Sequence, residues 1–294
     1  RPPRSTHCIS SAASDVYKRQ VFSDKFSGTL SAIEVLDIVQ SKFLDSNINA
    51  DFFSVTDGGQ ESTEIFKSHN FQTHESFEAL NCDNSLSVVE SLNINGSVFF
   101  ESAQLIGVDS ENESMSINTG CLLEAVQKTE VLGTGGSKTI DFGIGLLSKL
   151  GMEFISNGET IVNPIPKDFP YIDQIKATNF KSNLENRILS DTNISLLGEN
   201  SAFDVFGPQK GLSEKDIEKH KLEAERLITL IDKELILGLN PTEINSGAAG
   251  GLTFALNQIL GCEIENGAKY FLKETNLINQ LGNCLLYTSP SPRD

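Results

Sequence analysis

The stretch Gly133-Thr-Gly-Gly-Ser-Lys-Thr-Ile-Asp-Phe-Gly-Ile-Gly145 follows a short strand-like segment, Glu130–Leu132, and leads into an expected helix. Glycines between a strand and a helix let the backbone approach a phosphate closely and point N–H groups at it. The stretch is not a Walker A loop, because the glycines which that pattern requires would fall at Leu132 and Ser137. It predicts a strand–loop–helix unit with a phosphate-binding loop at Gly135, Gly136, Ser137 and Lys138.

Strand-like and helix-like segments alternate along the rest of the chain. The expected strands are Ala50–Thr56, Ser97–Phe100, Glu130–Leu132 and Asn186–Ser190. The expected helices are Ser31–Leu44, which opens with a Ser31/Glu34 capping box, and Asn118–Lys128, Gly143–Leu150 and Ser213–Leu235. Such alternation predicts an α/β protein with parallel strands, in which ligands bind at the carboxyl ends of the strands.

Two polar loops in the first quarter of the chain are candidate site segments. Ser23–Ala32 places Asp24 and Lys25 before a helix N-terminus, which can bind an anion, although a plain turn with an N-cap explains it too. Thr56-Asp-Gly-Gly-Gln60 follows a buried-looking strand and offers the carboxylate of Asp57. Asp-Gly is also the commonest turn signal, so both interpretations remain open.

Two further loops lie in the second half of the chain. Asp191 at a predicted strand end could bind a metal ion or accept a hydroxyl proton, and Lys210 between two glycines could contact a phosphate. Gly247-Ala-Ala-Gly-Gly251 precedes a helical run. Paired glycines there indicate close approach by a ligand or tight packing against other backbone.

The composition excludes several classes of partner. The formal net charge is −17, and clustered Lys or Arg, which a nucleic-acid backbone or an anionic membrane would reward, are missing. An anionic ligand would need local neutralisation by metal ions, backbone N–H groups or a few placed lysines. No run of about 18 apolar residues indicates a transmembrane helix.

Both ends of the sequence match translated sequencing-library adapter. Residues 1–20, ending in SSAASDVYKRQ, and residues 284–294, CLLYTSPSPRD, correspond to the two arms of a transposase-type adapter. We therefore expect a fragment cut at both ends. The remaining cysteines, Cys82, Cys121 and Cys262, are odd in number and widely spaced, which favours a reducing, cytoplasmic compartment over a disulfide framework.

The order of these loops resembles that of type I glycerate kinases. That family carries D-S/K-F-K-G-S/T-L-S/T-A, A/S-D-G-G, G-x-G-G-S-x-T-x-D-x-G-x-G, D-V/T-x-N-P-L-x-G, F-G-P-Q-K-G and G-A-A-G-G in this order. The matching segments are Asp24–Ala32, Asp57–Gly59, Gly133–Gly145, Asp191–Gly198, Phe206–Gly211 and Gly247–Gly251. This chain departs from the family at Ser27, where the usual residue is Lys, at Gln60–Ser62 and at Asn193–Leu196. In the third loop Lys138 is unusual, and Ile140 and Phe142 replace the Asn and the first Gly of the family's usual N-D-G-G.

The resemblance implies ATP-dependent phosphorylation of glycerate with Mg²⁺ as cofactor. The catalytic residues would be Asp24, Lys25, Asp57 and Asp191, with Lys25, Ser27 and Asn193 for the substrate. Nucleotide contacts would come from Gly135, Gly136, Ser137, Lys138, Gln209, Lys210, Gly247, Gly250 and Gly251, and Mg²⁺ ligands from Asp57, Asp141 and Asp191. The alternatives are a kinase for another small hydroxy acid and an inactive, ligand-binding relative.

The resemblance also implies two domains. Residues 21–62 and 265–283 would form part of an incomplete flavodoxin-like or Rossmann-like parallel-sheet domain. Residues 63–264 would form a second α/β domain inserted into it. The family continues beyond this chain with a T-G-E-G segment, so we expect the fragment itself to be inactive. The isolated histidines His69, His74 and His220 are expected on the solvated surface.

Overall fold

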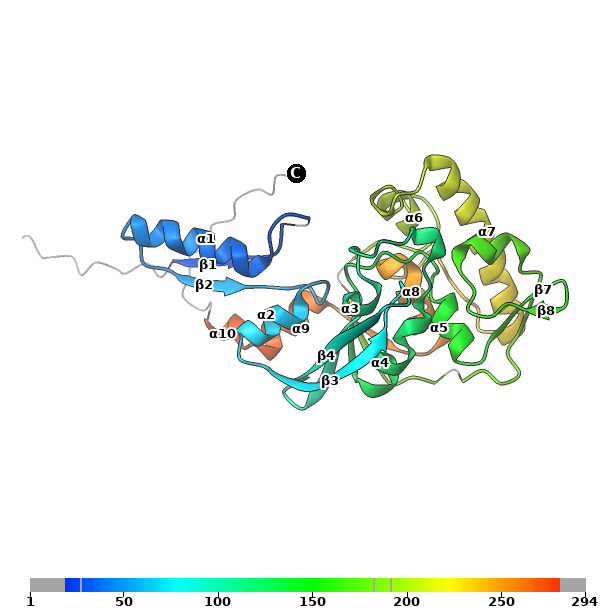
Figure 1. The fold of residues 1–294 in the computed structure, drawn as a ribbon, viewed down its shortest axis with the longest axis horizontal. Helices are drawn as coiled ribbons and strands as arrows, with labels where there is room; N and C mark the ends of the chain where they lie inside the picture. Colours follow the sequence, from blue (N-terminus) through cyan, green and yellow to red (C-terminus); the bar gives the residue numbers. More distant parts are fainter. Residues whose placement is uncertain (1–18, 27, 182, 191, 281–294) are drawn as a thin grey trace, which may run out of the picture. The chain divides into compact units, whose positions relative to one another are not determined.

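The computed structural model describes residues 19–26, 28–181, 183–190 and 192–280 (Figure 1). Its contacts divide the chain into two compact units. The small unit contains the described residues up to Ser54 together with Asn276–Gln280, and the large unit is Val55–Thr275. The sequence placed these boundaries near residues 62 and 265. The assignment of the small unit to a flavodoxin-like domain stays a prediction.

The small unit is a strand–helix–strand motif. It contains β1 (Gln20–Ser23), α1 (Ala32–Asp45), β2 (Asp51–Ser54) and the short α10 (Leu277–Gln280). The strands are parallel, and the rings of Phe22 and Phe53 stack with their centroids 5.3 Å apart. The predicted capping box is confirmed, because Glu34 N donates to Ser31 Oγ (3.2 Å) and Ser31 N donates to Glu34 Oε2 (2.8 Å).

A six-stranded mixed sheet with the order β11-β10-β6-β5-β4-β3 forms the centre of the large unit. Its strands are β3 (Gln72–Leu80), β4 (Leu86–Ile94), β5 (Ser97–Glu101), β6 (Val131–Gly133), β10 (Arg187–Leu189) and β11 (Glu263–Glu265). The last four are parallel, which confirms the predicted α/β class. The antiparallel hairpin β3–β4 was not predicted. A separate antiparallel sheet contains β7 (Glu153–Ser156), β8 (Glu159–Thr160) and β9 (Gln174–Lys176).

The two faces of the large sheet carry different cores, and consecutive residues of β5 point into each. Phe99 contacts Phe66 at 5.2 Å between ring centroids, and Phe66 in turn contacts Phe271 at 5.3 Å. These partners come from α2 (Ser62–Ser68) and α9 (Gly267–Glu274). Phe100 belongs to the main apolar core with Leu132 and other residues of the remaining elements. Burial on both faces explains why the central strands are apolar throughout.

The other helices of the large unit are short except for α7. They are α3 (Ala103–Ile106), η1 (Ser114–Ser116), η2 (Thr119–Leu122), α4 (Leu123–Lys128), α5 (Ile144–Lys149), η3 (Pro166–Tyr171), α6 (Ala202–Phe206), η4 (Pro208–Lys210), α7 (Glu214–Leu235), η5 (Ala248–Gly251), α8 (Leu252–Phe254) and the π-helix η6 (Ala255–Ile259). All the helices that the sequence predicted are present, although the segment Asn118–Lys128 divides into η2 and α4.

Helix α7 buries one stripe of side chains and exposes the charged remainder. Ile217, His220, Ala224, Leu227, Ile228 and Ile231 form the buried stripe. The prediction that His220 lies on the solvated surface is therefore wrong, since its side chain is only 2% exposed. Its ring stacks on Phe169 and meets Phe203 edge to face.

Candidate active site

The carboxyl ends of the four parallel strands lie in one row. Glu101, Gly133, Leu189 and Glu265 are consecutive partners across β5, β6, β10 and β11. Thr56–Gln60 lies across this row, because a Cβ atom added to Gly133 would lie 2.1 Å from Gly58 O. A Cβ atom added to Gly267, at the start of α9, would lie 1.6 Å from Asp57 O. The Asp57 loop and the Gly133–Gly145 loop therefore meet at the edge where ligands bind in parallel α/β sheets.

The glycines of the predicted phosphate loop are required by contact with the Asp57 loop. A Cβ atom on Gly135 would lie 2.7 Å from Gly59 Cα, and one on Gly136 would lie 2.6 Å from Gln60 Cβ. Gly136 also has a φ of 76°, which favours glycine. Packing between the two loops accounts for both glycines, and their contact with nucleotide phosphates stays a prediction.

Asp57 offers the most available carboxylate oxygen among the predicted residues of the large unit. Its Oδ1 accepts a hydrogen bond from Gly59 N at 2.8 Å, which fixes the side chain within its own loop. A Cβ atom on Gly135 would lie 3.9 Å from that oxygen, so the carboxylate lies close to the glycine-rich backbone. No residue in the described ranges bonds to Oδ2, and the side chain is partly exposed. Asp57 can therefore offer an oxygen to a cation or to a substrate hydroxyl.

Asp141 differs, because both of its carboxylate oxygens are occupied. Oδ2 accepts from Thr119 N, Thr119 Oγ1 and Gly145 N at 2.7, 2.9 and 3.0 Å. Oδ1 accepts from Thr139 Oγ1 at 2.9 Å and from Gly143 N at 3.1 Å. The fully buried carboxylate is thus the anion at the N-terminus of α5. The role of Asp141 as an Mg²⁺ ligand stays a prediction, and the occupied oxygens do not favour it.

Ser137 and Lys138 point their functional groups to different surroundings. Ser137 is buried, and its hydroxyl has no hydrogen-bond partner within the part of the chain that the structure describes. A buried hydroxyl without a hydrogen-bond partner is unusual, and it is consistent with a ligand that accepts a hydrogen bond from this hydroxyl. Lys138 instead donates from Nζ to Ser110 O and from its backbone N to Ile106 O (2.8 Å). Its ammonium group is therefore bound to the 107–112 loop.

Gln209 and Lys210 belong to the 3₁₀ turn η4, directly after α6. Gln209 is exposed, whereas Lys210 Nζ donates a hydrogen bond of 2.7 Å to the backbone oxygen of Thr139. Burial lowers the pKa of Lys210 to about 7, and the nearby carboxylate of Asp141 partly opposes this change. Through this hydrogen bond, the amine of Lys210 contacts the glycine-rich loop at Thr139.

Tight packing, one of the two interpretations left open by the sequence, accounts for Gly247–Gly251. Added Cβ atoms would lie 2.6 Å from Ser195 O at Gly247 and 1.9 Å from Thr139 O at Gly250. Gly251 has a φ of 89°, and a Cβ atom there would lie 2.6 Å from Phe142 Cβ. Contact of these glycines with a nucleotide stays a prediction.

The remaining predicted residues belong to either unit or lie outside the described residues. Asp24 and Lys25 belong to the small unit, where Asp24 Oδ1 accepts from Lys25 N at 2.7 Å. Asn193 is exposed in the large unit. Ser27 and Asp191 lie outside the described residues. No group of three His, Cys, Asp or Glu within the described ranges could hold a metal ion by itself.

Two departures from the family pattern lie in the core. Ile140 and Phe142 are buried on either side of Asp141, and the ring of Phe142 contacts Phe169 at 5.3 Å. Phe142 stands where the pattern has glycine and still has a left-handed φ of 37°. These two differences therefore change packing behind the loop.

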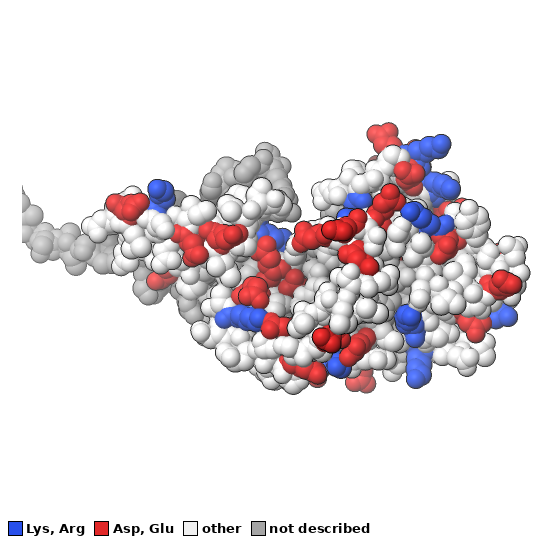
Figure 2. Space-filling view, in the orientation of Figure 1, with Lys and Arg blue, Asp and Glu red and all other residues white. Residues whose placement is uncertain are grey.

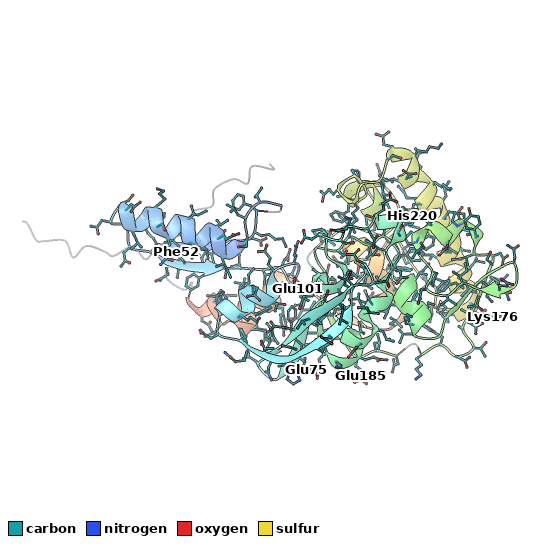
Figure 3. All side chains as sticks on the ribbon, viewed as in Figure 1. Phe52, Glu75, Glu101, Lys176, Glu185 and His220 are labelled. Carbon is teal, nitrogen blue, oxygen red and sulfur yellow. The ribbon has the colours of Figure 1, made fainter. Side chains whose placement is uncertain are left out.

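Sequence reasoning missed the carboxylate of Glu101 (Figure 3), which is buried at the end of β5. Its oxygens accept from Glu61 N at 2.9 Å and from Thr63 N at 2.8 Å, so it binds the N-terminus of α2 directly after the Asp57 loop. The signal in the sequence that could have identified Glu101 is an acidic residue at the end of an apolar strand. Glu101 and Asp141 thus supply fixed anions to the two helices that follow the two meeting loops.

Acidic side chains are spread over much of the face drawn in Figure 2, with fewer basic ones, as the net charge of −17 requires. The described part of the chain contains no helix that is both long and apolar enough to cross a membrane. Cys82, Cys121 and Cys262 are free thiols.

Comparison with known proteins gives consistent matches along the chain. The profile of the glycerate kinase family matches residues 20–288. Glycerate 2-kinase of Escherichia coli (strain K12) is 25% identical in an alignment 287 residues long, which covers 90% of this chain and 74% of that protein. Glycerate kinase of Bacillus subtilis (strain 168) is 25% identical in an alignment 274 residues long, which covers 85% of this chain and 70% of that protein.

One solved structure shows the same fold. The crystal structure described as glycerate kinase 2 from Salmonella typhimurium LT2 matches with a TM-score of 0.68 at 21% sequence identity. The match covers 91% of this chain and 76% of that chain. The α/β architecture inferred from the alternating segments is therefore found in a solved protein.

Proposed function

The chain belongs to the glycerate kinase family, and from this premise we propose that it transfers the γ-phosphoryl group of ATP to a hydroxyl group of glycerate. Membership of a kinase family implies ATP as the phosphoryl donor. The observation that carries the proposal is the contact between the Asp57 loop and the glycine-rich loop at the carboxyl edge of the sheet. This contact brings together the Asp57 carboxylate, one oxygen of which has no partner among the described residues, and a backbone segment with a buried hydroxyl that suits phosphates.

Phosphoryl transfer requires mainly that the reactants be positioned and that the charge of the phosphates be neutralised. We assign the phosphates to the Gly135-Gly136-Ser137 segment. The hydroxyl of Ser137, which has no hydrogen-bond partner among the described residues, can donate to a phosphate oxygen there. Asp57 would orient the attacking hydroxyl or bind the metal ion, and Asp24, Lys25 and Asp191 keep their proposed roles from the family pattern. Lys210 contacts Thr139 instead, and this contact favours a different role for Lys210.

Mg²⁺ fits the donor set, because it commonly uses one or two carboxylates together with phosphate oxygens and water. Asp57 has the free oxygen for this purpose, and Asp191 is the second proposed ligand. The ion would neutralise phosphate charge next to a chain whose net charge is −17. The fully hydrogen-bonded Asp141 is the weakest of the three proposed ligands.

The test is ADP formation in a protein of the relatives' full length that carries residues 21–283 unchanged. We expect turnover that requires both Mg²⁺ and glycerate. Because the Escherichia coli relative is a glycerate 2-kinase by name, we expect 2-phosphoglycerate as the product. ³¹P NMR distinguishes it from 3-phosphoglycerate. Turnover only with another hydroxy acid in a substrate panel would transfer the proposal to that acid. Calorimetric binding of ATP and glycerate without any turnover would support the inactive relative.

A further inference from the structure

We infer that Lys210 is a positioning residue, which holds the glycine-rich loop in place through Thr139 rather than contacting a phosphate of ATP. The inference rests on the proposed function only in assigning the phosphates to that loop. Its direct observation is the hydrogen bond of 2.7 Å from Lys210 Nζ to the backbone oxygen of Thr139.

The backbone N–H and the backbone oxygen of Lys210 are both held by hydrogen bonds. Its backbone N donates to Gly207 O at 3.0 Å, and its backbone oxygen accepts from Ser114 Oγ at 2.6 Å. The 3₁₀ turn η4 begins with Pro208, whose restricted φ limits the turn further. The amine therefore reaches Thr139 from an anchored backbone, as a supporting side chain must.

Thr139 needs this donor because its carbonyl lies in a buried part of the loop. Thr139 is fully buried, and Gly250 approaches so closely that an added Cβ atom would lie 1.9 Å from Thr139 O. A buried backbone oxygen without a hydrogen-bond partner is strongly disfavoured. Without Lys210 Nζ, the oxygen would lose the donor that reaches it from outside the loop.

The next residue is held in the same way. His220 Nε2 lies 2.8 Å from Ile140 O, so the carbonyls of Thr139 and Ile140 both bind side chains from the α6–α7 region. Asp141 then receives its donors from Thr119, Thr139, Gly143 and Gly145. Three consecutive residues are therefore immobilised directly after Ser137 and Lys138.

The chemistry of the amine agrees with anchoring. A phosphate contact is strongest with a permanent cation, whereas a carbonyl can accept a hydrogen bond from either an ammonium group or a neutral amine. Burial lowers the pKa of Lys210 to about 7, which agrees with a role that does not require a permanent positive charge. The carboxylate of Asp141 is already occupied by five donors, which leaves the Thr139 carbonyl as the observed partner of the amine.

Hydrogen exchange tests the inference without requiring activity. We compare Lys210→Met, Lys210→Arg and, as the matched control, Lys176→Met, which removes an exposed lysine in β9 (Figure 3). In the absence of nucleotide, we expect amide exchange in residues 139–145 of Lys210→Met to rise at least about 10-fold above the control. Lys210→Arg keeps an N–H donor, so its exchange should stay within about threefold of the unsubstituted chain.

The kinase assay supplies the second readout. Lys210→Met should lower kcat about 10-fold with less than a threefold change in the KM for ATP, and Lys210→Arg should recover most of the loss. Unchanged exchange in residues 139–145 together with loss of calorimetric ADP binding would instead assign Lys210 to the phosphates. If Lys210→Met does not fold, Lys210→Gln replaces it, because its shorter side chain does not place a donor at the position of Nζ. Unchanged exchange in residues 139–145 of that variant would overturn the inference.

Discussion

The imidazole of His220 donates from Nε2 to the backbone oxygen of Ile140 across 2.8 Å, which links α7 to the segment behind the glycine-rich loop. The carbonyl can only accept, so Nε2 carries the proton in the neutral ring. Burial lowers the pKa of His220 to about 4, and the hydrogen bond to Ile140 only partly opposes this change. The structure therefore requires a neutral histidine in its core.

This requirement predicts a pH-dependent stability. Between about pH 6.5 and 4 the unfolded chain binds a proton at His220 that the folded chain does not, so stability falls as the pH falls through this window. Across the window, His220 should account for about 3 kcal/mol of the free energy of unfolding. Urea unfolding at pH 7 and 4.5 should show a smaller loss for His220→Gln than for the unsubstituted chain. Equal losses in both proteins would show that burial does not lower the pKa of His220.

Substitution of Asp57 should affect activity more than stability. Asp57→Asn keeps an acceptor for Gly59 N but removes the charge and weakens the free oxygen as a metal ligand or base. We expect kcat to fall by at least about 100-fold, with the melting temperature unchanged to within a few degrees. A coupled ADP assay and a thermal melt measure the two effects. The exposed carboxylate of Glu159 provides the control, since Glu159→Gln should leave both values unchanged.

Substitution of Asp141 should affect stability first. Asp141→Ala leaves the buried donors of Thr119, Gly143 and Gly145 without their acceptor. It also removes the negative charge at the N-terminus of α5. The free energy of unfolding should fall by at least about 3 kcal/mol in urea titrations at pH 7. A loss below about 1 kcal/mol, the usual range for an exposed site, would show that the carboxylate is not structural.

The residue that follows α7 offers a stabilising substitution. Ile236 caps the helix with φ 56° and ψ 47°, a left-handed conformation that strains a β-branched side chain, and the residue is 87% exposed. Ile236→Gly should raise the free energy of unfolding by about 1 kcal/mol, because glycine is the usual residue at this position. The neighbouring Leu237→Gly lacks this benefit and serves as the control. A melting temperature that falls equally in both variants would argue against strain at Ile236.

Local signals predicted the strands and helices well. The Ser31/Glu34 capping box identified the start of α1, and the glycines that begin with Gly133, the last residue of β6, indicated the loop before α5. The hairpin β3–β4 was harder to predict, because β3 is an exposed edge strand whose sequence, such as His74 and Glu75, lacks a clear apolar face. His220 was misassigned because polar sequence neighbours hid its place between Ile217 and Ala224 on the buried stripe.

The candidate site was predictable as a set of loops but less so residue by residue. Asp57 and Asp141 have the same side chain in similar glycine-rich surroundings, yet only Asp57 keeps a free oxygen among the described residues. The difference arises because Thr119 donates to Asp141 from another segment. The sequence of either loop contains no trace of such a donor, so the distinction depends on tertiary contacts.

The contact between Gly59 and Gly135 has a consequence for how this protein can change. Any larger side chain at either position would push the two backbones apart, so each loop limits which sequences the other can accept. Gly59 and Gly135 therefore act as one constraint on sequence change, since a larger residue at either position is accepted only if the backbone of the other loop moves away.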